Sequence, residues 1–168
     1  DPRTVLHVVR TVDGNPYLHH TDGSYWRVCD FISDSICLDA PETPEDFYQS
    51  AVAFGNFQHQ LRDFPAHTLV ETIPNFHNTK KRYANFLAAL ERNASGRAHL
   101  VADEIKFITD RADKCSLIVD ALECGDLPLR VTHNDTKLSN ILLDETTEEA
   151  VCIIDLDTTM PGLSIYDF

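Results

Sequence analysis

Short apolar runs separated by turn residues fill the first part of the chain. Residues 5–12, 16–20 and 24–32 are rich in β-branched, aromatic and other apolar side chains, as strands are. The tripeptides at 13–15 and 21–23, Asp-Gly-Asn and Thr-Asp-Gly, have the chemistry of tight turns. The pattern predicts an antiparallel meander of strands.

The period of the apolar residues changes after the proline-containing link at 38–46. Thr43 is placed to cap a helix in which Pro44 takes the first position and Asp46 the third. An apolar stripe of helical spacing follows: Phe47, Ala51, Phe54 and Leu61. Similar stripes predict further helices at 80–92, 98–109 and 113–124, with Gly125 as a stop signal.

Short β segments return after the last predicted helix. Apolar strands at 129–132, 140–144 and 151–157 are separated by a polar loop and a charged turn. The sequence therefore predicts an α+β fold in two parts. Residues 1–32 form a small β unit, and residues 33–168 form a mainly helical unit that ends in a β-loop-β-turn-β element.

Composition narrows the class of protein. The 168 residues contain only short apolar runs and no zones typical of a secretory signal, so we expect a cytoplasmic location and no membrane partner. The net charge of −13 argues against nucleic acid as a partner and leaves open a cationic substrate or plain solubility. Five cysteines, mostly among apolar neighbours and without C-x-x-C spacing, predict reduced core thiols rather than disulfides or a zinc site.

The stretch "VTHNDTKLSNILLD", residues 131–144, concentrates polar side chains between two apolar strands. Phosphoryl transfer from ATP needs a carboxylate that accepts the proton of the attacking hydroxyl, and oxygen ligands that hold Mg²⁺. The spacing His133-x-Asp135, then Asn140, then Asp155 after the next strand is the kinase catalytic-loop pattern. It predicts Asp135 as the base and Asn140 and Asp155 as Mg²⁺ ligands. Lys137 either meets the transferring phosphoryl group or is a solvated loop residue.

The variant "HNDTKLSNILLD…IIDLD", with neither D-F-G nor A-P-E after it, resembles the aminoglycoside phosphotransferase and choline kinase superfamily. The segments "FGNFQHQLRDFP", "ETIPNFHNT", "HNDTKLSN" and "IIDLDTTMPGLSIYDF" are similar to bacterial N-acetylhexosamine 1-kinases, over most of residues 17–168. The resemblance implies a protein-kinase-like fold with ATP and Mg²⁺ as cofactors. It also implies a sugar acceptor, phosphorylated on the anomeric hydroxyl of an N-acetylhexosamine.

The same resemblance places residues outside the loop. It implies that residues 1–32 are the last antiparallel strands and the hinge of an N-lobe, and that 33–168 are the mostly helical C-lobe. Backbone groups at Cys29, Asp30 and Phe31 would then face the adenine of ATP. Asp167 would steady the catalytic loop by accepting backbone hydrogen bonds, and His133 would pack beneath that loop as a structural residue.

Two parts of a working kinase are not found in the sequence. A glycine-rich cover for the phosphates and a strand lysine held by a helix glutamate are both required. The first lysine is Lys80, and residues 1–32 contain no Gly-x-Gly. We therefore expect an incomplete N-lobe, a C-lobe that continues beyond Phe168, and a fragment with little or no kinase activity alone.

Several residues keep more than one interpretation. Asp157 contacts a second metal, positions the first, or caps a turn. His19 and His20 are expected on exposed hairpin surface rather than at a metal. The segment "TIPNFHNT" offers a sugar contact or a helix cap through Asn75, His77, Asn78 and Thr79, with the cap favoured for Asn78 or Thr79.

Two rival functions stay open beside the sugar kinase. The first keeps the fold but takes choline, homoserine or an aminoglycoside as acceptor, and cationic acceptors suit the acidic chain. The second is a pseudokinase, a non-catalytic binding module that keeps the loop for folding. The sequence leaves the oligomeric state undetermined.

Overall fold

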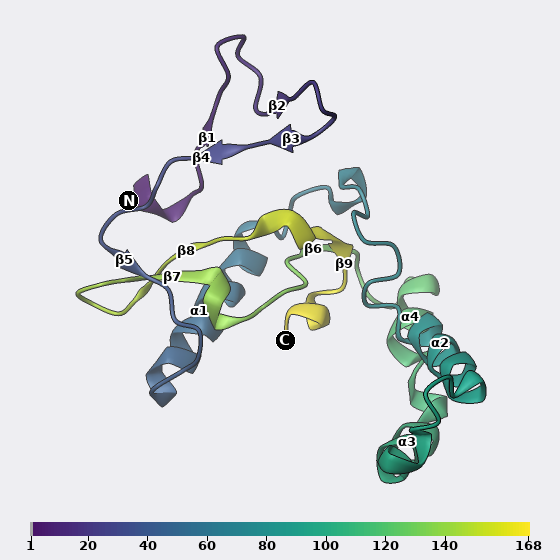
Figure 1. The fold of residues 1–168 in the computed structure, drawn as a ribbon. Helices are drawn as coiled ribbons and strands as arrows, with labels where there is room; N and C mark the ends of the chain where they lie inside the picture. Colours follow the sequence, from purple (N-terminus) through teal and green to yellow (C-terminus); the bar gives the residue numbers. More distant parts are fainter. Residues whose placement is uncertain (1) are drawn as a thin grey trace. The chain divides into compact units, whose positions relative to one another are not determined.

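The computed structural model describes residues 2–168 and divides the chain into two compact units, each built from separate stretches. The first unit contains the chain up to Leu61 together with residues 135–157, and the second contains residues 62–134 together with 158–168. Within the described residues, four α-helices accompany small antiparallel sheets (Figure 1). The α+β class is therefore confirmed, whereas the lobe boundary at residue 32 stays a prediction.

Strands of the first unit lie in the stretch predicted to be β. They form two antiparallel pairs, β1 (Val8–Val9) with β4 (Val28–Cys29) and β2 (Leu18–His19) with β3 (Tyr25–Trp26). Gly14 and Gly23 occupy the two predicted turns with φ of 82° and 88°, values that favour glycine. The predicted meander is wrong in its order, because the segment that holds β3 and β4 pairs with both earlier segments. Among residues 2–168, no strand pairing joins β1, which ends at Val9, to β2, which begins at Leu18.

A third sheet of the first unit, with three strands, lies beside the longest helix. Its strands, in the order β5-β7-β8, are β5 (Ser35–Ile36), β7 (Ile141–Asp144) and β8 (Ala150–Ile153). Helix α1 (Pro44–Gln60) packs on it through a core of Ala53, Phe54, Ile141 and Leu143. The strand that follows the polar loop, β7, is therefore anchored by packing against α1.

The start of α1 is confirmed in detail. The Thr43 hydroxyl accepts the backbone N–H of Asp46 at 3.3 Å, and Asp46 Oδ2 accepts the backbone N–H of Thr43 at 2.9 Å. This is a capping box with Pro44 at the first helical position. The predicted apolar stripe is only partly buried, since Phe47 and Ala51 are exposed. The strands beneath α1 are only two to four residues long, so they cover only part of a 17-residue helix.

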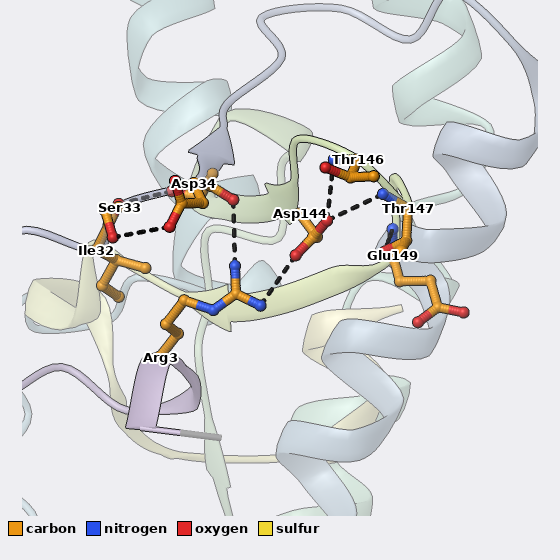
Figure 2. A network of polar contacts seen from close by, with 9 residues as sticks. Arg3, Ile32, Ser33, Asp34, Asp144, Thr146, Thr147 and Glu149 are labelled. Atoms are coloured by element: carbon orange, nitrogen blue, oxygen red, sulfur yellow. Dashed lines mark hydrogen bonds and ion pairs between the residues drawn. The ribbon is translucent and has the colours of Figure 1, made fainter.

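Arg3 links separate parts of the first unit (Figure 2). Its Nη2 lies 2.9 Å from Asp144 Oδ2, and its Nη1 donates to the Asp34 carbonyl at 3.2 Å. Asp144 Oδ1 also accepts the backbone N–H groups of Thr146 and Thr147, each at 2.9 Å. These bonds, those of Thr147 and Thr146 before that of Arg3, lower the pKa of Asp144 to about 2. The carboxylate thus stabilises the turn between β7 and β8.

The second unit contains the other helices. These are α2 (Thr79–Arg92), α3 (Ala102–Thr109) and α4 (Leu117–Glu123). Each predicted helix is confirmed, although 3-10 turns at Ala98–Val101 and Ala112–Lys114 replace the expected starts of α3 and α4. The Asn78 side chain accepts the Lys81 N–H at 2.8 Å, which confirms it as the cap of α2. Lys80 bonds Asp120 at 2.9 Å and so links α2 to α4.

A short antiparallel pair carries the beginning of the polar loop. Strand β6 (Arg130–Thr132) pairs with β9 (Met160–Gly162), and a 3-10 turn at Ser164–Asp167 follows β9. Val131, Met160 and Leu163 are buried here. Strand β9 was not predicted, because "MPG" contains a proline and a glycine, which are depleted in strands.

The cysteine prediction holds only in part. Cys152 is buried, whereas Cys37 and Cys124 are exposed, so the expectation of core thiols is wrong for these two. The strands and helices are short and cover little of the surrounding chain. Both cysteines lie just beyond the end of such an element, so their thiols stay exposed. Within the described part of the chain, no helix has the length and apolar character needed to cross a membrane.

Candidate active site

The predicted catalytic loop leaves β6 and returns into β7. Its last residues form a 3-10 turn at Leu138–Asn140, directly before β7 begins at Ile141. The structure assigns its first residues, up to Asn134, to the second unit and residues from Asp135 onward to the first.

In the second unit, Asp167 holds the start of the loop. Its Oδ2 accepts the backbone N–H of His133 at 2.8 Å, and its Oδ1 accepts that of Asn134 at 2.7 Å. His133 is 0% exposed, and its carbonyl accepts the Thr158 hydroxyl at 2.7 Å. The expectation that Asp167 accepts backbone hydrogen bonds is confirmed, and so is the burial of His133, whereas a purely structural role for His133 stays a prediction.

Asn134 was not singled out in the sequence, yet its side chain links two neighbouring segments. Its Nδ2 donates to the carbonyls of Thr132 at 3.1 Å and Thr158 at 2.8 Å. Its φ is 68°, a left-handed conformation that asparagine adopts more readily than most residues. The only sequence signal for this role is an asparagine at a sharp bend, which many loops share.

In the first unit, Asp135 and Asn140 are bonded to each other. Asn140 Nδ2 donates to Asp135 Oδ2 and to the Asp135 carbonyl, both at 2.9 Å. Asn140 is only 3% exposed, so its amide has few alternative orientations. Because the nitrogen faces Asp135, Oδ1 is the amide atom left to act as a ligand.

Lys137 also contacts Asp135. Its Nζ lies 2.9 Å from Asp135 Oδ2, with the lysine side chain 54% exposed and the aspartate side chain 35% exposed. The hydrogen bond and charge of Asp135, and then the charge of Asp155, raise the pKa of Lys137. Lys137 is thus both largely exposed and paired with Asp135, and its two interpretations, a contact with the phosphoryl group or a solvated loop residue, stay predictions.

Asp155 follows β8 and lies near these residues. The Ile154 N–H donates to the Asn140 carbonyl at 2.9 Å, which fixes the residue before Asp155 beside Asn140. Asp155 is exposed and has a φ of 57°, so the chain turns sharply at this position. The structure thus joins Asp135, Lys137 and Asn140 directly and brings Asp155 to them through the backbone.

This set of residues fits a magnesium ion. Mg²⁺ prefers oxygen ligands and is usually held by one or two carboxylates plus substrate phosphates. Asp155 supplies an exposed carboxylate and Asn140 an oriented amide oxygen. Among residues 2–168 there is no group of three or more His, Cys, Asp or Glu side chains suited to a metal, and the set here needs none.

Asp157 has a partner that no sequence pattern indicated. Its Oδ1 lies 2.9 Å from Arg27 Nη2, and both side chains are largely exposed. The ion pair joins the segment after β8 to the segment between β3 and β4. Whether Asp157 also contacts a metal stays a prediction.

The predicted adenine contacts are positioned at the end of β4. The Asp30 N–H donates to the His7 carbonyl at 2.9 Å, so this donor is already engaged. Cys29 lies within the β1–β4 pair, and the Phe31 side chain is 92% exposed. The role of Cys29, Asp30 and Phe31 in binding ATP stays a prediction.

The histidines of the first hairpin are exposed, as predicted. His19 stacks on Tyr25 with ring centroids 4.4 Å apart, and His20 lies 3.0 Å from Asp22 Oδ1. Stacking and a local carboxylate account for both side chains without a metal.

A carboxylate held by a buried amide, with a second carboxylate one strand further on, favours the class of phosphotransfer enzymes. The chain belongs to the phosphotransferase enzyme family (APH), whose family model matches residues 2–168. The match supports the predicted aminoglycoside phosphotransferase and choline kinase superfamily, a group of kinase-type enzymes. Similarity to N-acetylhexosamine 1-kinases stays a prediction.

Proposed function

We propose that this chain carries the catalytic loop of an ATP- and Mg²⁺-dependent kinase that phosphorylates the anomeric hydroxyl of an N-acetylhexosamine. One observation carries the proposal: Asp135 Oδ2 is bonded at 2.9 Å by both Asn140 and Lys137. These two partners fix the orientation of the carboxylate, and its partial exposure leaves it accessible to an acceptor hydroxyl. A general base in phosphoryl transfer needs both properties.

Asp135 would act on the acceptor hydroxyl. The hydroxyl proton passes to the carboxylate as the sugar oxygen bonds the γ-phosphorus, and the bond to the β-γ bridging oxygen breaks to release ADP. Lys137, displaced from Asp135 by the incoming phosphate, would neutralise charge on the transferring group. Asn140 and Asp155 would hold Mg²⁺, which when bound would supply further charge neutralisation on the phosphates.

The acceptor is proposed from the resemblance of four separated segments to N-acetylhexosamine 1-kinases. The lobes would then divide at residue 32, with Cys29, Asp30 and Phe31 beside the adenine. We propose a cytoplasmic enzyme, since ATP is its phosphoryl donor. The 168 residues alone are expected to show little or no kinase activity, because no lysine precedes Lys80 to pair with the phosphates.

A substrate panel tests the proposal. The complete gene product is incubated with ATP, Mg²⁺ and one acceptor at a time: N-acetylglucosamine, N-acetylgalactosamine, choline, homoserine or an aminoglycoside. We expect ADP release with the two N-acetylhexosamines and a sugar 1-phosphate by phosphorus NMR. If only choline, homoserine or an aminoglycoside is phosphorylated, the proposed sugar acceptor is wrong and that compound takes its place. MgATP binding without turnover of any acceptor would indicate a pseudokinase.

A further inference from the structure

A cavity lies within the second unit, and its lining includes none of the candidate site residues Asp135, Lys137, Asn140 and Asp155. It has a volume of about 130 Å³ and opens to the surface. Pockets for drug-sized ligands are usually about 300–1,000 Å³. At roughly 30 Å³ per water, this cavity has room for a group about the size of four waters. It suits one substituent of a ligand rather than a whole ligand.

The base of this cavity is apolar. Val119 and Met160 are buried, and Leu122 is half-buried beside them. Met160 is held in place, because its sulfur accepts the backbone N–H of Ile73 at 3.3 Å. A methyl group is the kind of substituent that such a surface takes out of water.

The rim contains an imidazole with a defined tautomer. His77 Nε2 lies 3.3 Å from the Asn134 carbonyl, and a carbonyl can only accept, so Nε2 carries the hydrogen. Nδ1 of the neutral ring is then an acceptor. Phe76 and Tyr166 flank the ring with centroids 4.7 Å and 5.1 Å away, which limits its rotation.

Two further polar side chains of the cavity come from the segment before α2. Glu71 Oε1 accepts the backbone N–H of Asn75 at 2.8 Å, and Asn75 has a φ of 61°. This tight turn leaves the Asn75 carboxamide exposed on the rim. The rim therefore offers the Asn75 carboxamide, which can donate and accept, and His77 Nδ1, which accepts. Both lie at the rim of a cavity with an apolar base.

We propose that this cavity receives the acetamido group of the N-acetylhexosamine acceptor, an inference that rests on the proposed function. The methyl would meet Leu122 and Val119, the amide N–H would donate to His77 Nδ1, and the amide carbonyl would accept from Asn75. A hydroxyl at the same sugar carbon has no methyl group to contact the apolar base. It is also too small to bond His77 Nδ1 and Asn75 together. The cavity would thus select acetylated sugars.

The covalent structure supports this assignment. Asn134 is part of the cavity wall, and the next residue in the chain is the proposed base Asp135. Consecutive Cα atoms are about 3.8 Å apart across a trans peptide. In an N-acetylhexosamine, the carbon that carries the acetamido group is bonded to the anomeric carbon. A pocket for that group must therefore lie close to the base that serves the anomeric hydroxyl.

A competition experiment with the complete gene product tests the assignment. N-acetylglucosamine and N-propanoylglucosamine are mixed with limiting ATP, and the ratio of the two phosphorylated products is measured. Leu122→Ala lengthens the cavity, so we expect the ratio to shift toward the propanoyl sugar by about tenfold. Ile118→Ala, on the same helix and outside the cavity, is the matched control and should leave the ratio within about twofold of wild type.

A second variant addresses the polar rim. Asn75→Gly keeps the left-handed backbone and removes the carboxamide, so the preference for N-acetylglucosamine over glucose should fall at least about tenfold. Asn93→Gly, another left-handed asparagine, is its control. Product ratios within one mixture do not depend on the folded fraction of a variant.

The outcomes separate the two proposals. Wild-type turnover of N-acetylglucosamine with unshifted ratios in both Leu122→Ala and Asn75→Gly would overturn the acetamido site alone. If the wild-type protein phosphorylates no N-acetylhexosamine, the proposed function and this inference fail together. A shift in both variants and in neither control supports the site.

Discussion

Asp167 Oδ1 accepts the backbone N–H of Asn134 at 2.7 Å, one residue before the proposed base Asp135. The other oxygen of Asp167 accepts the N–H of His133 at 2.8 Å. In Asp167→Asn one carboxylate oxygen is replaced by an NH₂ group, which donates and cannot accept. One buried backbone N–H then has no acceptor, and the free energy of unfolding should fall by about 1–3 kcal/mol. Urea unfolding measures this, and turnover should fall as well.

The control for this variant is Asp113→Asn, at an exposed position of the same unit. It removes the same charge from the second unit without touching the loop. Equal urea midpoints for the two variants would show that the Asp167 bonds do not stabilise the loop start.

Asp135→Asn should separate binding from chemistry. The amide keeps the size of the side chain but cannot take the acceptor proton, and the loss of a general base lowers kcat by about 10²–10⁴-fold. MgATP affinity, measured by calorimetry on the complete gene product, should change little. A kcat close to wild type would remove Asp135 from the proposed role.

Asp155→Asn should act on the metal instead. Asparagine also adopts the left-handed φ of 57° found here, so the fold should persist while one negative ligand is lost. We expect weaker MgATP binding and a higher Mg²⁺ requirement, and EDTA should abolish turnover of the wild type. Asp34→Asn, with a φ of 53° outside the site, is the control. Unchanged Mg²⁺ dependence in Asp155→Asn would contradict the assignment.

Asp144 should make stability depend on pH in the acid range. Its folded pKa of about 2 lies below the ordinary 3.8, because Thr147, Thr146 and Arg3 bond the charged form. This contribution is fully present above pH 4 and is lost as the pH falls from about 4 to about 2. Asp144→Asn should therefore flatten the curve of urea midpoint against pH in that window.

A neighbour provides the comparison for Asp144. Glu145 lies in the same turn, and among residues 2–168 its side chain has no hydrogen-bond or ion-pair partner, so Glu145→Gln is a matched change of charge. It should keep the wild-type pH dependence between about pH 4 and pH 2. Identical curves for Asp144→Asn and the wild type would show that the turn bonds do not survive in solution.

Gly162 should not tolerate a side chain. A Cβ there would lie 2.5 Å from Thr132 Oγ1 and 3.0 Å from Tyr166 Cδ2. Thr132 is fully buried, so Gly162→Ala should destabilise the protein by about 1–3 kcal/mol. Gly55→Ala, with nothing within 4 Å of the new Cβ, should be neutral or stabilising by up to about 1 kcal/mol. Thermal unfolding of the two variants compares them directly.

Local patterns in the sequence were enough for most elements. The capping box at Thr43, the cap at Asn78 and the turns at Gly14 and Gly23 were all predicted and all form. Each depends on residues only a few positions apart, so propensity and spacing encode it. The predicted strand order was wrong, because the pairing between β1 and β4 joins residues that are separated by two intervening turns.

The sequence by itself determined the family of this protein and the groups available for its proposed chemistry: an acid, an amide and a second acid in kinase spacing. Only the tertiary structure decided which distant residues hold that chemistry. Asp167 lies 33 positions from Asn134, and Arg27 lies 130 positions from Asp157. Such partners meet only after the chain has folded, and any carboxylate or guanidinium on the surface has many possible partners along the sequence. The reason is physical: a hydrogen bond depends on distance in space, which local sequence patterns do not specify.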